Sequence, residues 1–303
     1  MVLQLSHHVT PAFAARIACV LTGWLFMAAA VAQQINAGPY VPSPQSVVAD
    51  MLKLAGIGPA DFVIDLGSGD GRIVLTAAKV YGARGFGVEI QDNLVKLSNE
   101  AAKNEGLADR VRFLKQDLFK TDISQASVLT MYLLPNTVNM LSEKLQSELK
   151  PGTRILSHDY GLSGWIPEET KVFDLEDKIK ISGVMTTIIY LYVVPAKVAV
   201  RWGRKLAPAV AKQPVSLELT QQMQKIGGIA RVGGREVPIE DARLVGGKIS
   251  FRLPVERGRA LAFEGAGKGQ GNRRHGGNGR RALALERAAG RKVRRDETHR
   301  PQR

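Results

Sequence analysis

Apolar residues in the middle of the chain follow two different spacings. Between Ser43 and Gly56 they recur every three or four positions, which predicts an amphipathic helix. Ser43-Pro44 would open that helix with a capping hydroxyl and a proline at the first helical position. The run Phe62–Leu66 is instead almost unbroken in its apolar character, which is typical of a strand buried on both faces.

The two spacings alternate as far as residue 194. Further helices are expected at 71–81, 92–106 and 135–149, and further strands at 85–90, 111–115, 127–134, 153–158, 171–175 and 185–194. Strands that alternate with helices indicate an α/β fold with helices on both faces of the sheet. We therefore expect a doubly wound, Rossmann-like, mostly parallel seven-strand sheet. No helix is expected between the last two strands, so that end should be antiparallel.

The chain changes character after this domain, which we place at residues 40–195. Residues 196–214 form a basic linker, and 215–264 have the short alternating runs of a small antiparallel β addition. Turns are expected at three glycine pairs, Gly227-Gly228, Gly233-Gly234 and Gly246-Gly247. Residues 265–303 are rich in glycine and arginine and are expected to be a disordered tail. A reading-frame slip is an alternative origin for that tail.

The net charge of +14 first suggests a nucleic-acid partner. Residues 265–303, however, carry 12 Lys and Arg against 3 Asp and Glu, which is +9 of the +14. The basicity therefore belongs mainly to the tail, and a nucleic-acid partner is not expected for the folded part. A metal site is not expected either, because Cys19 is the single cysteine and the five histidines are scattered.

The first 33 residues resemble an export signal. Arg16 precedes an apolar run, and Ala30-Val31-Ala32 has the small residues of a signal-peptidase site. The alternatives are an uncleaved membrane anchor or a wrong start codon. An exported, periplasmic or membrane-anchored protein is therefore expected, with the cytoplasmic face as the remaining possibility.

A glycine-rich loop lies between the first predicted strand and the helix after it. It runs from Asp65 through Gly67, Ser68, Gly69 and Asp70 to Gly71. Glycines here let the backbone turn sharply and approach a nucleotide-like ligand. A dinucleotide loop would have glycine where Arg72 stands, and the leading acid suits a ligand with an ammonium and a sulfonium better than a diphosphate. S-adenosylmethionine (SAM) has both cations and no phosphate.

Three residues at or just after the ends of the second and third strands complete the expected cofactor site. Glu89 ends the second strand, where a carboxylate can accept hydrogen bonds from both ribose hydroxyls. Asp117 follows the third strand, where the adenine amino group would lie; a simple turn acid is the alternative. Leu118 can pack on the adenine face or in the core.

The motif Asp65-x-Gly67-x-Gly69-x-Gly71, with Glu89 and Asp117, is similar to the class I, seven-strand SAM-dependent methyltransferases. Further motifs narrow the resemblance: Tyr40-Val-Pro-Ser-Pro, Thr130-Met-Tyr-Leu-Leu-Pro, Ser157-His-Asp-Tyr and Trp165-x-Pro. Together they resemble the archaeal broad-specificity protein lysine methyltransferases and their mitochondrial relatives. The likeness covers residues 40–194, and in mitochondrial members the acceptors include lysines of membrane proteins.

Lysine methylation requires a neutral amine, so the acceptor channel must desolvate it or supply a base. Tyr40, Tyr132 and Trp165 are the candidate aromatic walls. Tyr132 is equally readable as a core residue, and for Trp165 the packing role is the favoured alternative. His158 and Asp159 are the candidate proton acceptors, with a purely structural role as the alternative. The acceptor would approach from the open ends of the fourth and fifth strands.

The expected function is therefore SAM-dependent methyl transfer to lysine amines of proteins. The alternatives are a small-molecule methyltransferase of the same fold and a non-catalytic module that binds SAM or a partner. A protein substrate is the expected partner, and membrane association could come from the N-terminal segment. The sequence does not indicate an oligomeric state.

Overall fold

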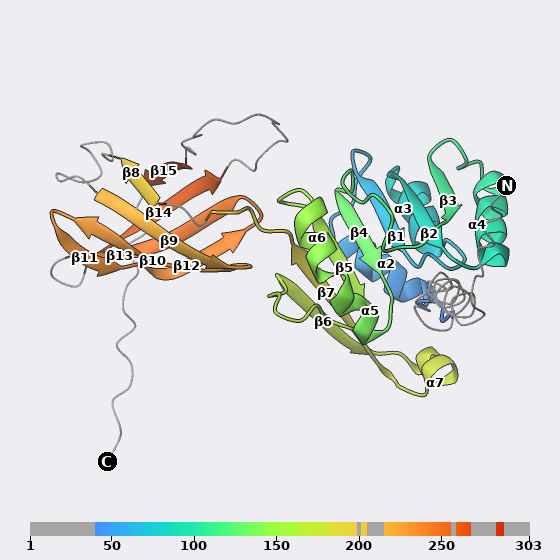
Figure 1. Ribbon diagram of the computed structural model, residues 1–303. Coiled ribbons are helices and arrows are strands. Elements are labelled where there is room, and N and C mark those ends of the chain that lie inside the picture. Colours follow the sequence, from blue (N-terminus) through green and yellow to red (C-terminus); the bar gives the residue numbers. More distant parts are fainter. Residues whose placement is uncertain (1–39, 199–200, 205–214, 256–258, 268–282, 288–303) are drawn as a thin grey trace, which may run out of the picture. The chain divides into compact units, whose positions relative to one another are not determined.

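The computed structural model describes residues 40–198, 201–204, 215–255, 259–267 and 283–287. The signal-like segment at 1–33 lies outside these residues. The described part contains a seven-stranded sheet with its helices and two four-stranded antiparallel sheets (Figure 1).

The seven-stranded sheet is doubly wound, as the sequence predicts. Its strands are β1 (Phe62–Leu66), β2 (Arg84–Glu89), β3 (Val111–Lys115), β4 (Val128–Met131), β5 (Arg154–His158), β6 (Glu169–Asp174) and β7 (Thr186–Val193). They stand in the order β3-β2-β1-β4-β5-β7-β6. The first five are parallel, and β7 runs antiparallel to both β5 and β6. Because the order reverses beside β1, the carboxyl ends of β1 and β4 are where a ligand is expected.

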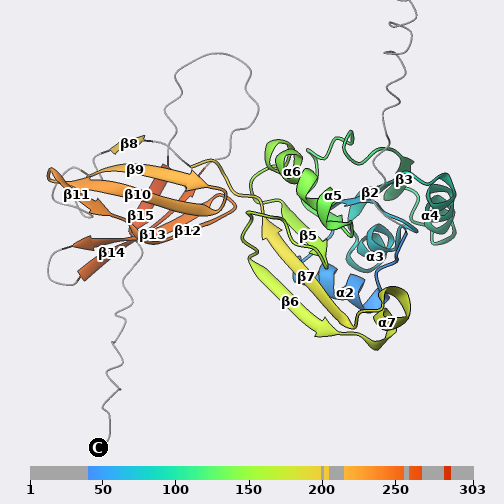
Figure 2. The ribbon, with the colours of Figure 1, turned by 60° about the horizontal axis from the view of Figure 1, so that its bottom comes forward.

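Helices cover both faces of this sheet (Figures 1 and 2). They are α2 (Gln45–Leu54), α3 (Arg72–Tyr81), α4 (Asp92–Asn104), α5 (Pro135–Met140), α6 (Ser142–Glu148) and α7 (Glu176–Ser182). The apolar sides of α2, α3 and α4 share one core with alternate residues of the strands, among them Val63 and Val128. The predicted helical spacing is confirmed here, because Val47, Met51 and Leu52 are fully buried.

Two predictions about the helices are wrong. The single helix expected at 135–149 is two, α5 and α6, because the Leu141 amide bonds to the carbonyls of both Thr137 and Val138 and tightens the turn there. A helix, α7, also separates β6 from β7, where none was expected. Its charged sequence, Glu-Asp-Lys-Ile-Lys, has too few apolar positions to show a helical period.

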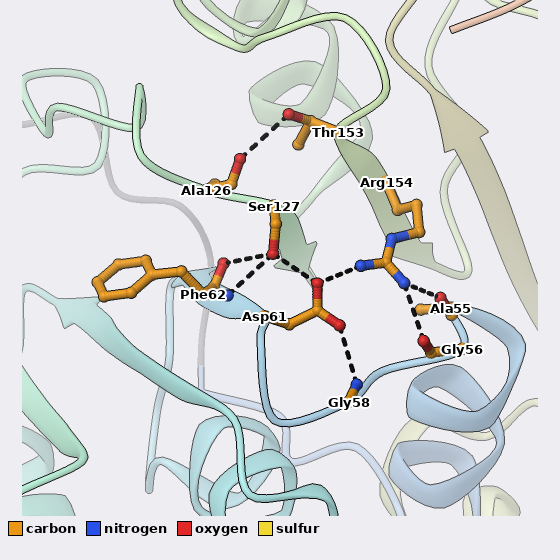
Figure 3. A network of polar contacts seen from close by, with 9 residues as sticks. All are labelled: Ala55, Gly56, Gly58, Asp61, Phe62, Ala126, Ser127, Thr153 and Arg154. Atoms are coloured by element: carbon orange, nitrogen blue, oxygen red, sulfur yellow. Dashed lines mark hydrogen bonds and ion pairs between the residues drawn. The ribbon is translucent and has the colours of Figure 1, made fainter.

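A polar network joins β1, β4 and β5 at their amino ends, away from the expected ligand side (Figure 3). Ser127 donates a hydrogen bond to Asp61 at 2.7 Å, and the Phe62 amide donates to Ser127 at 2.9 Å. Arg154 forms an ion pair with the same Asp61 carboxylate and donates to the carbonyls of Ala55 and Gly56. The network thereby ties the amino-terminal ends of these three parallel strands to one another.

The C-terminal β addition is larger than the sequence indicates. One sheet contains β8 (Arg201–Arg204), β9 (Val215–Gln222), β10 (Lys225–Val232) and β11 (Arg235–Pro238), and the other contains β12 (Glu240–Val245), β13 (Lys248–Val255), β14 (Arg259–Gly267) and β15 (Leu283–Arg287). One apolar core takes residues from both sheets, including Leu217 and Phe251. Turns occur at Gly233-Gly234 and Gly246-Gly247 as expected. Gly227-Gly228 lies inside β10 instead, where a side chain at Gly228 would strike the backbone of β9.

The expected linker and tail also contain strands. β8 lies within 196–214, and Ala196 and Val198 are buried in the β core. The expectation of disorder from residue 265 is wrong for 265–267, which extend β14, and for 283–287, which form β15 and pair with β14. Backbone pairing needs no apolar side chains, so composition does not reveal these strands. The other parts of 265–303 lie outside the described residues.

Within the described ranges, no helix is both long and apolar enough to cross a bilayer. Over the same ranges, histidine, cysteine and carboxylate side chains form no group that could hold a metal ion.

Candidate functional site

The glycine-rich loop is a tight backbone turn between β1 and α3. Gly67, Gly69 and Gly71 have φ angles of 78°, 53° and 82°, in the left-handed region that favours glycine. The amides of Gly67 and Ser68 both donate to the carbonyl of Val88 at 2.9 Å, which fastens the turn to β2. The sequence predicts this loop correctly.

The surroundings of the loop leave no room for side chains at these glycines. A Cβ at Gly71 would lie 2.5 Å from the Phe113 ring, and one at Gly69 would overlap the ring of Tyr40. A Cβ at Gly67 would lie 2.7 Å from Leu133. The backbone of the loop is thus closely packed against these side chains, so only glycine fits at the three positions.

Glu89 lies beside the loop at the carboxyl end of β2, as predicted. Its Oε2 accepts a hydrogen bond from the Gly69 amide at 3.1 Å, and its Oε1 accepts from the amides of Ile90 and Gln91 at 2.7 and 3.0 Å. The side chain is 9% exposed, so it is buried together with these hydrogen bonds. A carboxylate held in this way has a fixed position and, with two oxygens, would suit the two hydroxyls of a ribose.

Asp65 is fully enclosed at the end of β1. Thr130 of β4 donates a hydrogen bond to its Oδ1 at 2.7 Å. Burial raises the pKa of Asp65 to about 7, and Glu89 and Asp70 add to the rise, whereas the Thr130 bond opposes it. A cationic ligand beside this carboxylate would supply the positive charge that its surroundings lack.

Asp70 and Arg72 tie the loop to the segment before α2. The Arg72 guanidinium donates to both oxygens of Asp70, at distances between 2.6 and 3.0 Å, and to the carbonyl of Ser43 at 2.8 Å. Desolvation raises the pKa of Tyr40, and the Asp70 carboxylate raises it further. Tyr40 therefore keeps its proton and lies as a neutral ring against Gly69.

The remaining expected cofactor residues are Ser68 in the loop and Asp117 and Leu118 after β3. The Ser68 hydroxyl is buried and has no hydrogen-bond partner among the described residues, which leaves it for a ligand. Asp117 Oδ1 accepts a hydrogen bond from the Phe119 amide at 2.9 Å, which is the turn interaction expected as its alternative role. Its Oδ2 forms an ion pair with Lys120. Leu118 is buried to 9% exposure at this turn. These residues fit SAM.

A second polar cluster lies at the carboxyl ends of β4 and β5. The Tyr132 hydroxyl donates to Asp159 Oδ2 at 3.0 Å, and the Lys178 ammonium donates to Asp159 Oδ1 at 2.7 Å. Asp159 has a φ of 62°, an uncommon left-handed conformation for a residue with a side chain. Burial, followed by Asp159, raises the pKa of Tyr132 well above its usual range, so Tyr132 remains a hydrogen-bond donor.

His158 joins the two clusters. Its Nδ1 lies 2.8 Å from the Ser43 hydroxyl, and its ring contacts the Tyr132 ring at a tilt of 34°, with 3.9 Å between centroids. Burial lowers the pKa of His158 to about 4; Asp159 opposes this shift and Lys178 adds to it. The ring is therefore neutral at pH 7. Its Nε2 is buried and has no hydrogen-bond partner within the described part of the chain.

The structure brings Tyr132, His158 and Asp159 together as predicted, but not Trp165. Trp165 is 6% exposed, donates to Ser142 at 2.9 Å and packs edge-on against Tyr192, so it is a core residue and its assignment as a channel wall is wrong.

Sequence reasoning missed the roles of two residues. Ser43 was assigned to helix capping, yet its hydroxyl makes no cap bond and faces His158 instead. No role for Lys178 is predicted, because nothing in its local sequence sets it apart from its charged neighbours.

Comparison with known proteins finds similar methyltransferases. Residues 65–169 match the family model of the ANTKMT methyltransferase domain. A protein-lysine N-methyltransferase of Saccharolobus islandicus is 44% identical over 157 residues, which cover 52% of this chain and 93% of that protein. A solved structure of an RNA methyltransferase from Salinibacter ruber with S-adenosyl-L-homocysteine is 44% identical and covers 52% of this chain and 96% of its own, with a TM-score of 0.47.

A mammalian protein is also similar. The adenine nucleotide translocase lysine N-methyltransferase of Mus musculus is 35% identical over 129 residues, which cover 43% of this chain. The match spans 56% of that protein, little more than half its length. The archaeal match, by contrast, spans nearly the whole relative. The chain therefore belongs to the family of class I SAM-dependent methyltransferases that includes this archaeal protein-lysine N-methyltransferase.

Proposed function

We propose that this chain transfers a methyl group from SAM to the ε-amino group of lysine side chains in proteins. The observation that carries the proposal is the cluster of Tyr132, His158 and Asp159 beside the cofactor loop. It offers a carboxylate, a neutral imidazole and an aromatic wall where an amine acceptor would enter. The lysine specificity of the archaeal relative supports the same acceptor.

The cofactor side of the reaction follows from the loop and the ends of β1 and β2. SAM supplies a methyl group already activated by its sulfonium. Glu89 would hold the ribose hydroxyls, and the loop backbone from Gly67 to Gly71 would lie along the nucleoside. Asp65 would face the cationic part of the ligand, because its buried carboxylate has no positive partner among the described residues.

The acceptor side must present an amine without its proton. A lysine with a reference pKa of about 10.4 is neutral in roughly one molecule in a thousand near pH 7.4. His158, with a pKa of about 4, is too weak a base to remove that proton fully, so its role is to accept a hydrogen bond. Desolvation against the Tyr132 ring lowers the lysine pKa, and the proton leaves to solvent before the nitrogen lone pair attacks the methyl carbon and the sulfur–methyl bond breaks.

The proposal is tested by labelling. Lysate and membranes of the host are incubated with SAM carrying a radioactive methyl group and with the purified protein. The expected result is label in one or a few protein bands that protease removes and nuclease does not. Label in RNA or in a small molecule would instead leave methyl transfer in place and remove the lysine assignment.

Two variants make the labelling specific to this site. Gly69→Val should abolish labelling, because its side chain would fill the space next to the Tyr40 ring. Tyr132→Phe keeps the ring but removes the hydrogen bond to Asp159, so it should label the same bands more slowly. Equal labelling by wild type and Gly69→Val would contradict the cofactor site.

For location, we propose that residues 1–33 direct the protein to the cell envelope. The apolar run and the Ala30-Val31-Ala32 sequence support this, although SAM is made in the cytosol and an exported enzyme would need a supply of it. A periplasm-active reporter fused after Ala37 is expected to be active. Activity only of a cytosol-active reporter would contradict the proposal.

A further inference from the structure

A buried lysine of the chain itself occupies the acceptor side of the site. Lys178 of α7 is 4% exposed, and its Nζ lies 2.7 Å from Asp159 Oδ1. The same ammonium donates to the backbone carbonyl of Thr186 at 2.5 Å. A carboxylate and a carbonyl that converge on a buried ammonium are what an alkylammonium binding site requires, because a buried charge must be paired and hydrogen-bonded.

This ammonium site adjoins the cofactor loop. The other oxygen of Asp159 accepts a hydrogen bond from the Tyr132 hydroxyl. Leu133, the residue after Tyr132, lies against Gly67. Asp159 follows β5 directly, at the edge of the sheet where ligands of doubly wound folds bind. The lysine is therefore held at the edge of the sheet that carries the cofactor loop, where the proposed function places the acceptor amine.

Asp159 is held in place without Lys178. Its left-handed backbone is fixed by β7, since the Asp159 amide donates to the Ile188 carbonyl at 2.7 Å and the Ile188 amide donates to Asp159 Oδ1 at 3.2 Å. Strained conformations of this kind persist where the surroundings over-determine them, often at ligand sites.

A second buried polar atom points to a ligand other than Lys178. His158 Nε2 is 3.6 Å from Asp159 Oδ1 and has no hydrogen-bond partner among the described residues. Buried polar atoms are rarely left in this state. An amine bound at Asp159 could use Nε2 as a further acceptor.

The helix that carries Lys178 is short, with seven residues. Among the described apolar side chains of α7 and the turn after it, Ile179 is 45% exposed, Val184 55% and Met185 40%. Withdrawal of α7 would uncover little apolar surface at these described positions, whereas it would break the buried Lys178–Asp159 pair. A second ammonium in the same place would restore that pair.

We propose that Asp159 and the Thr186 carbonyl form the site that first binds the acceptor's alkylammonium group, before this group loses its proton. Lys178 occupies this site in the absence of acceptor and leaves with α7 when the acceptor lysine enters. The inference rests on the proposed function, since it names the group that the same site recognises. Lys178 thereby acts as an internal competitor that sets the apparent affinity for the acceptor.

The test compares Lys178→Met with Lys178→Arg, using a peptide that spans the lysine methylated by the wild-type protein. Methionine has a similar length and no charge, so the competitor is removed; arginine keeps a cation on Asp159. The KM for the peptide should fall about tenfold in Lys178→Met, as expected if about one wild-type molecule in ten has the site open. Lys178→Arg should not lower it. Lys180→Met, an exposed position on the same helix, is the control and should match wild type.

Melting temperature and SAM affinity show whether each variant is folded. A folded Lys178→Met with a higher KM or a lower kcat, and a normal Lys178→Arg, would mean that Lys178 is a structural partner of Asp159 and would overturn the proposal. If Lys178→Met does not fold, hydrogen exchange on the wild type decides. Amides of Glu176–Ser182 should exchange faster when peptide and S-adenosylhomocysteine are added, and slower or unchanged exchange would overturn the proposal. A wild type that methylates no lysine would instead defeat the proposed function itself.

Discussion

Glu89 combines two tasks, because the carboxylate that would bind the ribose also accepts hydrogen bonds from three backbone amides around the loop. Glu89→Ala should therefore weaken SAM binding by about 1.5–3 kcal/mol, or roughly 10- to 150-fold, the range for hydrogen bonds to a charged group. Isothermal titration calorimetry measures this. Glu105→Ala, which removes only an exposed ion pair with Lys79, is the control. Unchanged affinity in Glu89→Ala would remove the ribose assignment.

Asp65 should make cofactor binding depend on pH. Its folded pKa of about 7 lies above the usual value, so the apo protein holds a proton that the unfolded chain would release, and apo stability falls as pH rises from about 4 to 7. Only the ionised carboxylate attracts the cationic ligand. SAM affinity should therefore rise with pH, by up to about tenfold per unit below pH 7, and then level off. Calorimetry from pH 5.5 to 8.5 should show this rise, and Asp65→Asn should bind weakly with a flat profile. A flat wild-type profile would contradict the account.

His158 should weaken the fold in acid. Its folded pKa is about 4, below the value of about 6.5 in an unfolded chain. Between these values the unfolded state binds the proton and the folded state does not, so stability is lost as pH falls through 6.5. His158→Asn can still pair with Ser43 and should lose less stability between pH 6.5 and 4 in thermal melts. Equal acid sensitivity in both proteins would mean that another group is responsible.

At the scale of elements, the segment from Tyr40 to Ser43 links the cofactor loop to the acceptor cluster. Arg72 holds the Ser43 carbonyl, and the Ser43 hydroxyl holds His158. Ser43→Ala leaves His158 Nδ1 buried without its partner, at a cost of about 1–3 kcal/mol. We expect kcat to fall about tenfold while SAM affinity changes little, and Ser43→Thr to restore kcat because it keeps the hydroxyl. Equal kcat in Ser43→Ala and wild type would show that the link has no role in turnover.

The sequence predicts those elements whose apolar residues form a clear pattern or whose turns require a backbone conformation that only glycine adopts easily. The strands β1 and β3 and the glycine turn follow from buried runs and from positive φ angles, which depend on local sequence alone. The position of Lys178 and the partner of Ser43 depend on residues 19 and 115 positions away, Asp159 and His158, so no local pattern reveals them. The strand β15 is missed for a related reason, because pairing with β14 overrides its composition.

At the scale of the whole molecule, the domain with the seven-stranded sheet and the C-terminal β addition have separate apolar cores. A chain that ends at Gly267 loses β15, the pairing partner of β14. It should bind SAM within about twofold of wild type, while the β addition melts at a lower temperature by calorimetry. A chain that ends at Arg287 keeps β15 and is the control. A large loss of SAM affinity in the shorter chain would mean that the two cores are coupled.

Under the proposed function, one site both binds SAM and methylates a lysine amine. The most direct measurement is mass spectrometry of peptides from a labelled acceptor protein, treated with wild type or with Gly69→Val. The account predicts a mass increase of one or more methyl groups on a lysine side chain, present with wild type and absent with Gly69→Val. A methyl group found on a carboxylate, a thiol or a nucleotide, with every lysine unmodified, would contradict it.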